Sequence, residues 1–96
     1  MPRALVLNAK DTVATLLDSA REGEDVKLSG EVSGTLRLAG DIEYGHKLAA
    51  RAIKRGEPVL KYGIVIGRAT HDIQQGQHVH VHNVEALRGR GDKDKQ

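Results

Sequence analysis

Histidines concentrated near the C-terminus are the residues best suited to chemistry in this sequence. Three of the five histidines, His78, His80 and His82, alternate with Val79 and Val81. Alternation with period two is typical of a β-strand, in which successive side chains point to opposite faces. We therefore predict a strand that buries both valines in a core and sets the three imidazoles in one row on its exposed face.

Such a row offers suitable metal ligands, but its spacing limits how many can act together. Residues two apart on a strand have Cα atoms roughly 6.5–7 Å apart, and the outer two histidines would be about 13 Å apart. At most two of the three could therefore share one ion, with other groups completing the shell. Imidazole nitrogens favour zinc, iron, nickel or copper over magnesium or calcium. The alternative is an exposed strand face that is rich in histidine and binds no metal.

Two smaller groups could also carry chemistry. His46 is followed by Lys47, whose charge favours the neutral imidazole that suits a metal ligand or a base. Lys61 precedes Tyr62 and Gly63, and a cation beside a phenol could bind a carboxylate or a phosphate. The alternatives are an ordinary strand histidine in the first group and a strand end with a solvated lysine in the second.

Composition bounds the class of protein that presents these groups. Ninety-six residues without Phe or Trp suit one domain with an aliphatic core. The absence of Cys excludes disulfides, cysteine-held zinc and iron–sulfur clusters held by this chain alone. No apolar run reaches the ~18 residues of a membrane span, and the N-terminal run is too short for a secretory signal, so we expect a cytoplasmic protein. A near-balanced charge of +2, with no aromatic residues among the basic ones of the tail, argues against a nucleic-acid partner.

The first quarter of the chain predicts a strand followed by a helix. An apolar run at residues 4–7 indicates the strand. Asp11 is a suitable N-cap, and Gly23 lies where a left-handed stop is expected, so we predict a helix at about residues 11–21. The spacing i, i+3, i+4, i+7 of an amphipathic stripe supports this helix. The stripe consists of Val13, Leu16, Leu17 and Ala20.

The remainder of the chain predicts β-structure. Alternating leucines and turn residues predict a hairpin at residues 26–39, and the apolar run Ile64–Ile66 predicts a strand buried on both faces. An internal echo, Ile-x-x-Gly-x-x-Val, occurs at residues 53–59 and again at 73–79, with a partial third copy at 23–26. Two good copies are too few for a solenoid and suggest a pseudo-symmetric domain in which one turn-and-strand unit is used twice.

These motifs, taken in order, resemble the N-terminal domain of the altronate dehydratase and galactarate dehydratase family. The resemblance covers about residues 5–84, and it is the combined string that is specific. It is carried by Asp11–Leu17, Gly45–Ala50, Ile53-x-x-Gly56, Val59–Gly63, Ile66-Gly67, Ile73-x-x-Gly76 and His78–Asn83.

The resemblance implies a fold and an architecture. The expected fold is mainly β with one short N-terminal helix, of the SAF type, a small β-clip fold. The expected domain spans residues 1–87, followed by a disordered polar tail at 88–96. In the fused enzymes this domain precedes a large catalytic domain, whereas here the chain stops after the tail. The chain is therefore expected to be a stand-alone small subunit, similar to that of sulfolactate sulfo-lyase.

The resemblance also implies an activity. The family's dehydratases remove water from a sugar acid with the help of a divalent metal, iron(II) or a related ion. We expect a lyase subunit that eliminates water or sulfite from a sugar acid or hydroxy acid, inactive without its large catalytic subunit, with homo-oligomers possible. His80 and His82 are the expected metal ligands, and His46 is the expected catalytic base or third ligand.

Other residues are expected to contact the substrate. Lys61 and Tyr62 would steady its carboxylate, Asn83 would orient a hydroxyl, and Lys47 is expected as a further substrate-binding residue. One alternative is a non-catalytic module that binds substrate or closes over it while the large subunit does the chemistry. Another is a non-enzymatic β-clip protein of the antifreeze or pilus-assembly kind, which the histidine-rich strand and the missing export signal argue against.

Overall fold

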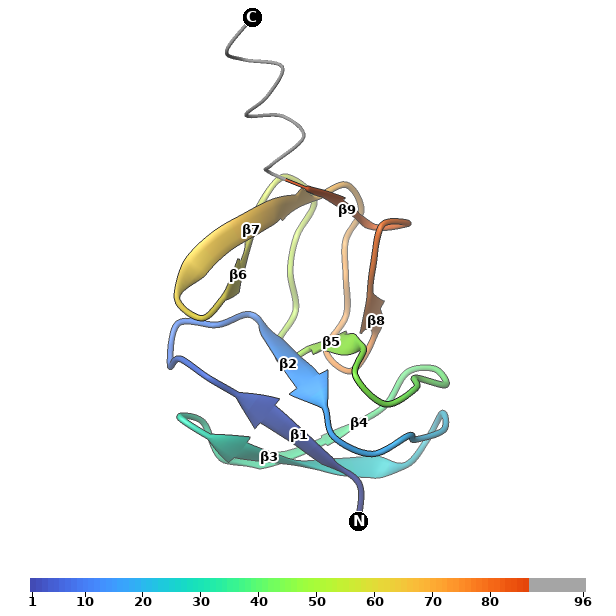
Figure 1. Cartoon of the computed structure of the whole chain (residues 1–96). Helices are drawn as coiled ribbons and strands as arrows, with labels where there is room; N and C mark the ends of the chain where they lie inside the picture. Colours follow the sequence, from blue (N-terminus) through green and yellow to red (C-terminus); the bar gives the residue numbers. More distant parts are fainter. Residues whose placement is uncertain (87–96) are drawn as a thin grey trace, which may run out of the picture.

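The chain folds as two β-sheets. The computed structural model describes residues 1–86, and within them every regular element is a strand. The larger sheet has the order β4-β3-β1-β2-β5-β8 and the smaller has the order β6-β7-β9, which Figure 1 shows above it. The strands are β1 (Arg3–Val6), β2 (Val13–Leu16), β3 (Asp25–Gly30), β4 (Gly34–Arg37), β5 (Lys47–Ala49), β6 (Pro58–Lys61), β7 (Ile64–Ala69), β8 (His78–Val79) and β9 (Val84–Ala86). The predicted mainly-β fold is confirmed, and residues 1–86 contain no helix that could cross a membrane.

The helix predicted at residues 11–21 is wrong. Val13–Leu16 forms β2 instead, paired antiparallel with both β1 and β5. The side chains of this strand enter two separate cores: Ala14 and Leu16 pack in one cluster, and Val13 packs in the other. Because both faces of β2 are buried, apolar residues occur without alternation, and the run imitates the stripe of an amphipathic helix.

Asp11, the predicted helix cap, holds a different element. Its buried carboxylate accepts hydrogen bonds from the backbone amides of Tyr62 at 3.0 Å, Gly63 at 2.7 Å and Asn8 at 3.2 Å. Tyr62 and Gly63 form the tight turn between β6 and β7, with φ of 58° and 73°. Asp11 therefore ties the connection between β1 and β2 to the hairpin of the smaller sheet.

Of the three other strand predictions, two are confirmed and the third is confirmed only in part. The first strand and the hairpin at residues 26–39 are confirmed as β1 and as the antiparallel pair β3–β4. The strand at Ile64–Ile66 exists as the start of β7, but its burial on both faces is wrong, since Ile64 is 65% exposed and Val65 is 38% exposed. The reason is that β9 pairs only with the second half of β7, from Gly67 onward. The tail predicted at 88–96 lies outside the described residues.

The repeated sequence motif corresponds to a turn that the structure forms at four places, residues 20–26, 42–48, 53–59 and 73–79. We call each of these a turn unit. The first residues of the units pair across isolated bridges, Ala20 with Ile42 and Ile53 with Ile73. A glycine follows three residues later, with φ between 86° and 90° in all four units, a conformation that favours glycine, and a strand begins two residues after it. The unit at 42–48 escaped the sequence comparison because it ends in Leu rather than Val.

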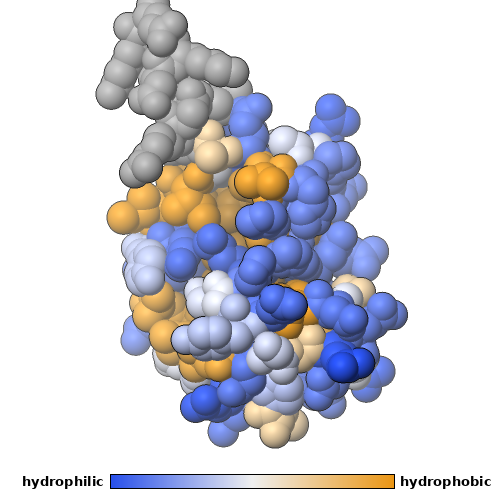
Figure 2. Space-filling model, turned by 45° about the vertical axis from the view of Figure 1, so that its right-hand side comes forward, coloured by the Kyte–Doolittle hydropathy of each residue, from blue (hydrophilic) through white to orange (hydrophobic). Residues whose placement is uncertain are grey.

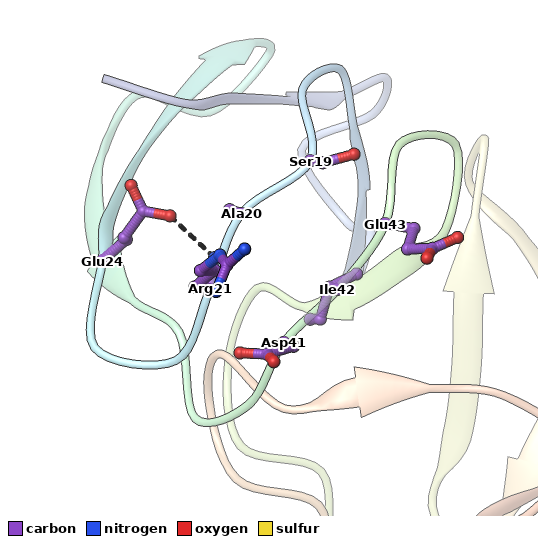
Figure 3. Close-up of a pocket in the computed structure, with 7 residues that line it drawn as sticks. All are labelled: Ser19, Ala20, Arg21, Glu24, Asp41, Ile42 and Glu43. Atoms are coloured by element: carbon purple, nitrogen blue, oxygen red, sulfur yellow. Dashed lines mark hydrogen bonds between the residues drawn. The ribbon is translucent and has the colours of Figure 1, made fainter.

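A side-chain hydrogen bond closes three of the four turn units. The residue after the glycine accepts a hydrogen bond from the backbone amide three positions earlier, and the distance is 2.7 Å each time. Figure 3 shows the first of these bonds, between Arg21 and Glu24. The acceptors are Glu24, Glu57 and Gln77. In the unit at 42–48 this position is His46, whose ring faces other histidines instead.

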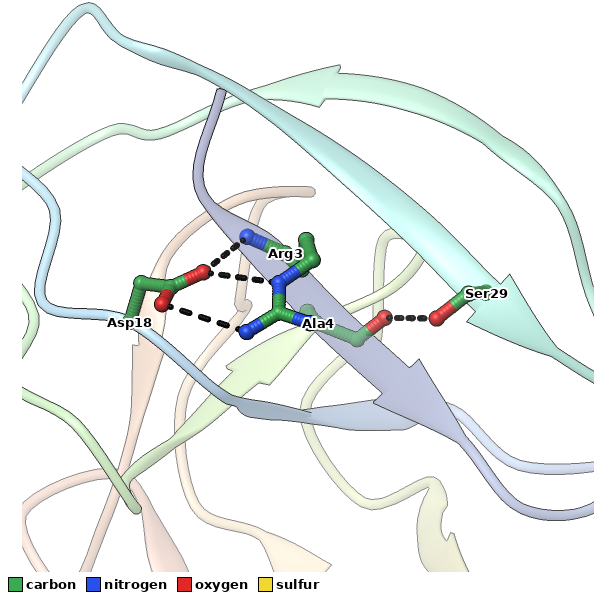
Figure 4. A network of polar contacts seen from close by, with 4 residues as sticks. All are labelled: Arg3, Ala4, Asp18 and Ser29. Atoms are coloured by element: carbon green, nitrogen blue, oxygen red, sulfur yellow. Dashed lines mark hydrogen bonds and ion pairs between the residues drawn. The ribbon is translucent and has the colours of Figure 1, made fainter.

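Polar contacts hold the N-terminal strand β1 to the segments on either side of it (Figure 4). Arg3 donates to Asp18 from its backbone amide at 3.0 Å and from Nε at 3.1 Å, and these bonds lower the pKa of the Asp18 carboxyl. On the other side, the Ser29 hydroxyl donates to the carbonyl of Ala4 at 3.5 Å. Because Arg3 and Asp18 are exposed, this ion pair orients β1 more than it stabilises it.

Candidate metal centre

The histidine-rich segment is a short strand followed by a tight turn. The strand predicted for residues 78–82 is wrong beyond Val79, because β8 contains only His78 and Val79. Residues 80–83 form a turn in which the backbone amide of Asn83 donates to the carbonyl of His80 at 3.0 Å. Val81 is consequently 79% exposed, and its predicted burial in the core is also wrong.

The turn brings four imidazoles together, and we call His46, His78, His80 and His82 the histidine cluster. The ring of His78 is central: its centroid lies 5.0 Å from that of His46, 5.4 Å from that of His80 and 5.6 Å from that of His82. His78 and His80 stack with an interplanar angle of 8°. The rings of His46 and His80 lie 5.7 Å apart.

Three of these residues have the geometry of a metal-ligand group. One ring nitrogen from each of His46, His78 and His80 lies within 4.8 Å of the other two. His46 Nδ1 and His78 Nε2 lie 3.0 Å apart. We call these residues the ligand triad. Nitrogens that share a metal at about 2.1 Å lie roughly 3–3.4 Å apart, so small side-chain rotations would let all three bind one ion.

The strand pairing explains why His46 meets the C-terminal histidines. Strand β5 begins at Lys47, directly after His46, and pairs antiparallel with β8. Lys47 lies opposite Val79 and Leu48 lies opposite His78, so the next step along the ladder sets residue 46 opposite residue 80. Two segments more than thirty residues apart in the sequence thereby deliver the ligand triad from neighbouring strand ends.

Electrostatics favour a neutral imidazole at the centre of the cluster. Partial burial lowers the pKa of His78, and repulsion by His46, His80, His82 and Lys47 lowers it further. A neutral imidazole has a free nitrogen lone pair, which a metal ligand requires. Lys47 is thus one of the charges that lower the pKa of His78, which lies on the neighbouring strand β8, and its predicted effect on His46 stays a prediction.

Lys47 also lines an apolar groove that adjoins the cluster. The groove has a volume of about 270 Å³ and shares His80 with the ligand triad. The remaining lining side chains are Ile66, Val79, Val81, Val84 and Ala86. Figure 2 shows hydrophobic surface on the left of the view, in an upper and a lower patch, and hydrophilic surface over most of the right. The histidines thus border a surface suited to apolar contact.

Asn83, predicted to orient a substrate hydroxyl, is buried beneath the turn with 3% of its surface exposed. Its Nδ2 donates to the carbonyl of His78 at 2.8 Å, and its Oδ1 accepts from the backbone amide of His80 at 3.0 Å. Both ends of the side chain therefore bind the backbone of the histidine segment, and a contact with substrate stays a prediction.

Lys61 and Tyr62 lie apart from the cluster. They sit at the tip of the β6–β7 hairpin, and Figure 1 shows this tip on the opposite side of the molecule from β8. The ammonium of Lys61 lies 5.0 Å from the centre of the Tyr62 ring, a cation–π contact. The structure does not bring these two residues to the histidines, so their predicted role with the substrate carboxylate would require another chain or another copy.

The ligand triad differs in one member from the ligands expected from the sequence. His78 was in the predicted row but not among the assigned ligands, whereas His82 was assigned and lies outside the triad. A metal role for His82 stays a prediction. The pairing of β5 with β8 brings His78 to His46, and the spacing of the histidines in the sequence does not reveal this pairing.

Comparison with known proteins identifies relatives of two kinds. Residues 2–87 match the family described as the altronate/galactarate dehydratase SAF domain. The chain is 34% identical over 85 residues to altronate dehydratase of Bacillus subtilis and 42% identical over 77 residues to that of Escherichia coli. It is also 53% identical over 47 residues to the (2R)-sulfolactate sulfo-lyase subunit alpha of Chromohalobacter salexigens.

The extent of these matches differs between the two kinds of relative. The matches cover 88% and 80% of this chain but only 16% and 15% of the two altronate dehydratases. The Chromohalobacter match covers 49% of this chain and 50% of that subunit. A family match over nearly all of the described residues nevertheless decides the classification. The chain belongs to the SAF-domain family of the altronate and galactarate dehydratases.

Proposed function

We propose that this chain is the small subunit of a two-chain lyase that eliminates water or sulfite from a sugar acid or hydroxy acid. The observation that carries the proposal is the ligand triad, three imidazole nitrogens within 4.8 Å of one another at the end of β8. Relatives named as altronate dehydratase and as a sulfo-lyase subunit support the lyase class.

The side chains of the triad fit a divalent metal, with iron(II) as the proposed ion. Imidazole is a good ligand for iron, zinc and nickel, and three protein ligands leave coordination positions open, as in catalytic sites. The lowered pKa of His78 keeps one central ligand neutral near pH 7. A bound ion would supply Lewis acidity, stabilising the negative charge that develops on a hydroxy acid when its α-proton is removed.

The chain's own residues would bind the substrate and accept its proton. Lys47 lines the groove that His80 borders, and an ammonium there would attract the substrate carboxylate. His82 contacts the ring of His78 and is exposed, and it is the imidazole of the cluster that the triad leaves over. We assign the uptake of the α-proton to a ring nitrogen of His82, since His46 is engaged with His78.

A larger lyase chain is the proposed partner. The sulfo-lyase relatives are named as subunit alpha, which implies a second subunit in those enzymes. The altronate dehydratase relatives extend far beyond the matched region, which is 16% of one and 15% of the other. Among residues 1–86 the candidate metal group contains three histidines and no carboxylate, so further ligands and acid–base groups would come from the partner.

The test is metal binding followed by turnover. The purified chain is titrated with iron(II) under anaerobic conditions, and the complex with its larger chain is assayed on altronate and on sulfolactate. His80→Ala should abolish both metal binding and turnover without unfolding the domain, because His80 is exposed. His71→Ala is the matched control, since His71 is exposed and lies outside the triad. Retention of metal and activity by His80→Ala would refute the proposal.

A second candidate function is favoured by the apolar groove. A hydroxylated, anionic substrate has little to gain from the side chains of Ile66, Val81 and Val84, whereas a protein segment does. In this alternative the chain docks on the larger subunit and closes over its active site without supplying catalytic groups. Turnover by the larger subunit alone, unchanged by His80→Ala in the complex, would favour this alternative.

A further inference from the structure

We propose that Asn83 is the positioning residue of the histidine cluster. Its buried amide fixes the turn at residues 80–83, and this turn converts a row of histidines into a cluster. The geometric part of this inference stands on the contacts alone, while its consequence for metal binding rests on the proposed function.

The contacts of Asn83 span the turn from both sides. The side-chain Nδ2 donates to the carbonyl of His78, and Oδ1 accepts from the amide of His80, at 2.8 and 3.0 Å. The backbone of Asn83 adds two more bonds, donating to the His80 carbonyl at 3.0 Å and accepting from the Thr70 amide at 2.9 Å. With 3% of its surface exposed, the residue has little access to competing water.

The effect of the turn is seen by comparison with an extended strand. A strand through residues 78–82 would hold the outer two Cα atoms about 13 Å apart. In the turn, the ring of His82 instead lies 5.6 Å from that of His78, and His80 stacks on His78 at 5.4 Å. An imidazole reaches only a few ångströms from its Cα, so the bend in the backbone is what allows His82 to touch His78.

The chemistry of the position calls for asparagine. The side chain must accept a hydrogen bond at one end and donate one at the other, and a carboxamide does both. Aspartate keeps the oxygen that accepts the hydrogen bond from the His80 amide. Its second oxygen, however, would face the carbonyl oxygen of His78, and two acceptors in contact repel each other. Alanine leaves the His80 amide and the His78 carbonyl without their partner in a buried place, which costs free energy and frees the turn.

The experiment compares Asn83→Ala and Asn83→Asp with Asp11→Ala. Asp11 is a matched control because it is also buried and also braces a turn, the one at Tyr62–Gly63. The first readout is the nuclear Overhauser effect between the His78 and His82 rings in the metal-free chain, because these are the two rings that an extended strand would hold apart. The second is the affinity for cobalt(II), measured by calorimetry on the same samples.

The expected results separate positioning from stability. In Asn83→Ala the Overhauser effect between the two rings should disappear, and cobalt(II) should bind about 10–100-fold more weakly, as is typical when a residue that orients a ligand is removed. Asn83→Asp should fall between this variant and the wild type. Asp11→Ala should lower the melting temperature while retaining both the Overhauser effect and the cobalt(II) affinity.

Each outcome bears on one of the two proposals. An Overhauser effect and a cobalt(II) affinity that survive in Asn83→Ala would overturn the positioning role. A wild-type chain that binds no cobalt(II), combined with an Overhauser effect that disappears only in the Asn83 variants, would refute the proposed metal site and leave the positioning role standing. If Asn83→Ala does not fold, Asn83→Asp decides by the same two readouts, since it replaces only the amide nitrogen by an oxygen.

Discussion

His46→Gln should stabilise the protein and at the same time disrupt the proposed metal site. His46 occupies the position after glycine in the turn unit at residues 42–48, where the other three units carry Glu24, Glu57 and Gln77. Those side chains close their turns by accepting a hydrogen bond from a backbone amide. A glutamine at position 46 has the same reach as Gln77 and should accept the corresponding bond from the amide of Glu43.

The size of the effect follows from the geometry of the three closed units. Their side-chain bonds are 2.7 Å long, short for an N–H···O bond, but they lie at the surface. A net gain of about 0.5–1 kcal/mol is therefore expected, the lower half of the usual range. For a domain of this size that corresponds to a rise in melting temperature of roughly 2–8 °C. The loss of one of three metal ligands should weaken iron(II) binding by more than about 100-fold, beyond the effect of losing a supporting residue.

The assay is thermal unfolding of the metal-free chain at about pH 8, where an unperturbed imidazole is neutral. Anaerobic iron(II) titration of the same preparations follows. Glu57→His is the reverse exchange in a turn unit that has no part in the histidine cluster, and it should lower the melting temperature. His71→Gln controls for the exchange itself, because His71 belongs to no turn unit.

Two results would refute this reasoning. A melting temperature that falls in His46→Gln would mean that His46 already stabilises its turn better than an amide does. Metal affinity that is unchanged in His46→Gln would remove His46 from the ligand triad, whatever happens to stability.

Three other perturbations probe the remaining parts of the structure. The pKa of His78 is lowered below the value of about 6.5 for an unperturbed histidine, so protonation of His78 favours the unfolded chain. The contribution of neutral His78 to the free energy of unfolding should be fully present above about pH 6.5 and should be lost as the pH falls toward the folded-state pKa. Melting temperatures measured from about pH 8 to pH 5 should therefore fall less steeply for His78→Gln than for the wild type. Asp11→Ala leaves partly buried amides at the β6–β7 turn without an acceptor and should cost about 1–3 kcal/mol in denaturant unfolding, whereas equal stability would show that water replaces the carboxylate. Val81→Ser should change the free energy of unfolding by less than about 0.5 kcal/mol, because Val81 is 79% exposed. The same substitution should weaken association with the proposed larger lyase chain in sedimentation experiments, and undiminished association would place the interface elsewhere.

The local β-signals in the sequence predicted the fold well where each element has one exposed face. The β3–β4 hairpin alternates buried leucines with exposed polar residues, and this alternation identified it. The signal failed at β2, where two cores compete for one strand, so that Val13 and Ala14 are both buried although they point to opposite faces. Tertiary burial on both sides removes the period on which sequence reasoning depends.

The candidate site was predicted in part for a related reason. The concentration of histidines identified the segment, but alternation is equally compatible with a strand and with a strand that ends after two residues. The deciding residue is Asn83, whose buried amide competes for the backbone of residues 78 and 80. Side-chain hydrogen bonds of this kind offer the backbone an alternative to the β-ladder, and nothing in the spacing of the histidines reveals them.

His46 shows how the repeated turn and the site constrain each other. Three turn units keep an oxygen acceptor that satisfies a backbone amide, and the fourth gives up that bond for a ring that faces His78 at 3.0 Å. Natural sequences are usually consistent in such local choices, and departures from consistency concentrate at functional positions. The departure at residue 46 is therefore an argument for function that is independent of the clustering of imidazoles. It also depends on the structure, because only the fold reveals that residues 42–48 form a fourth copy of the turn.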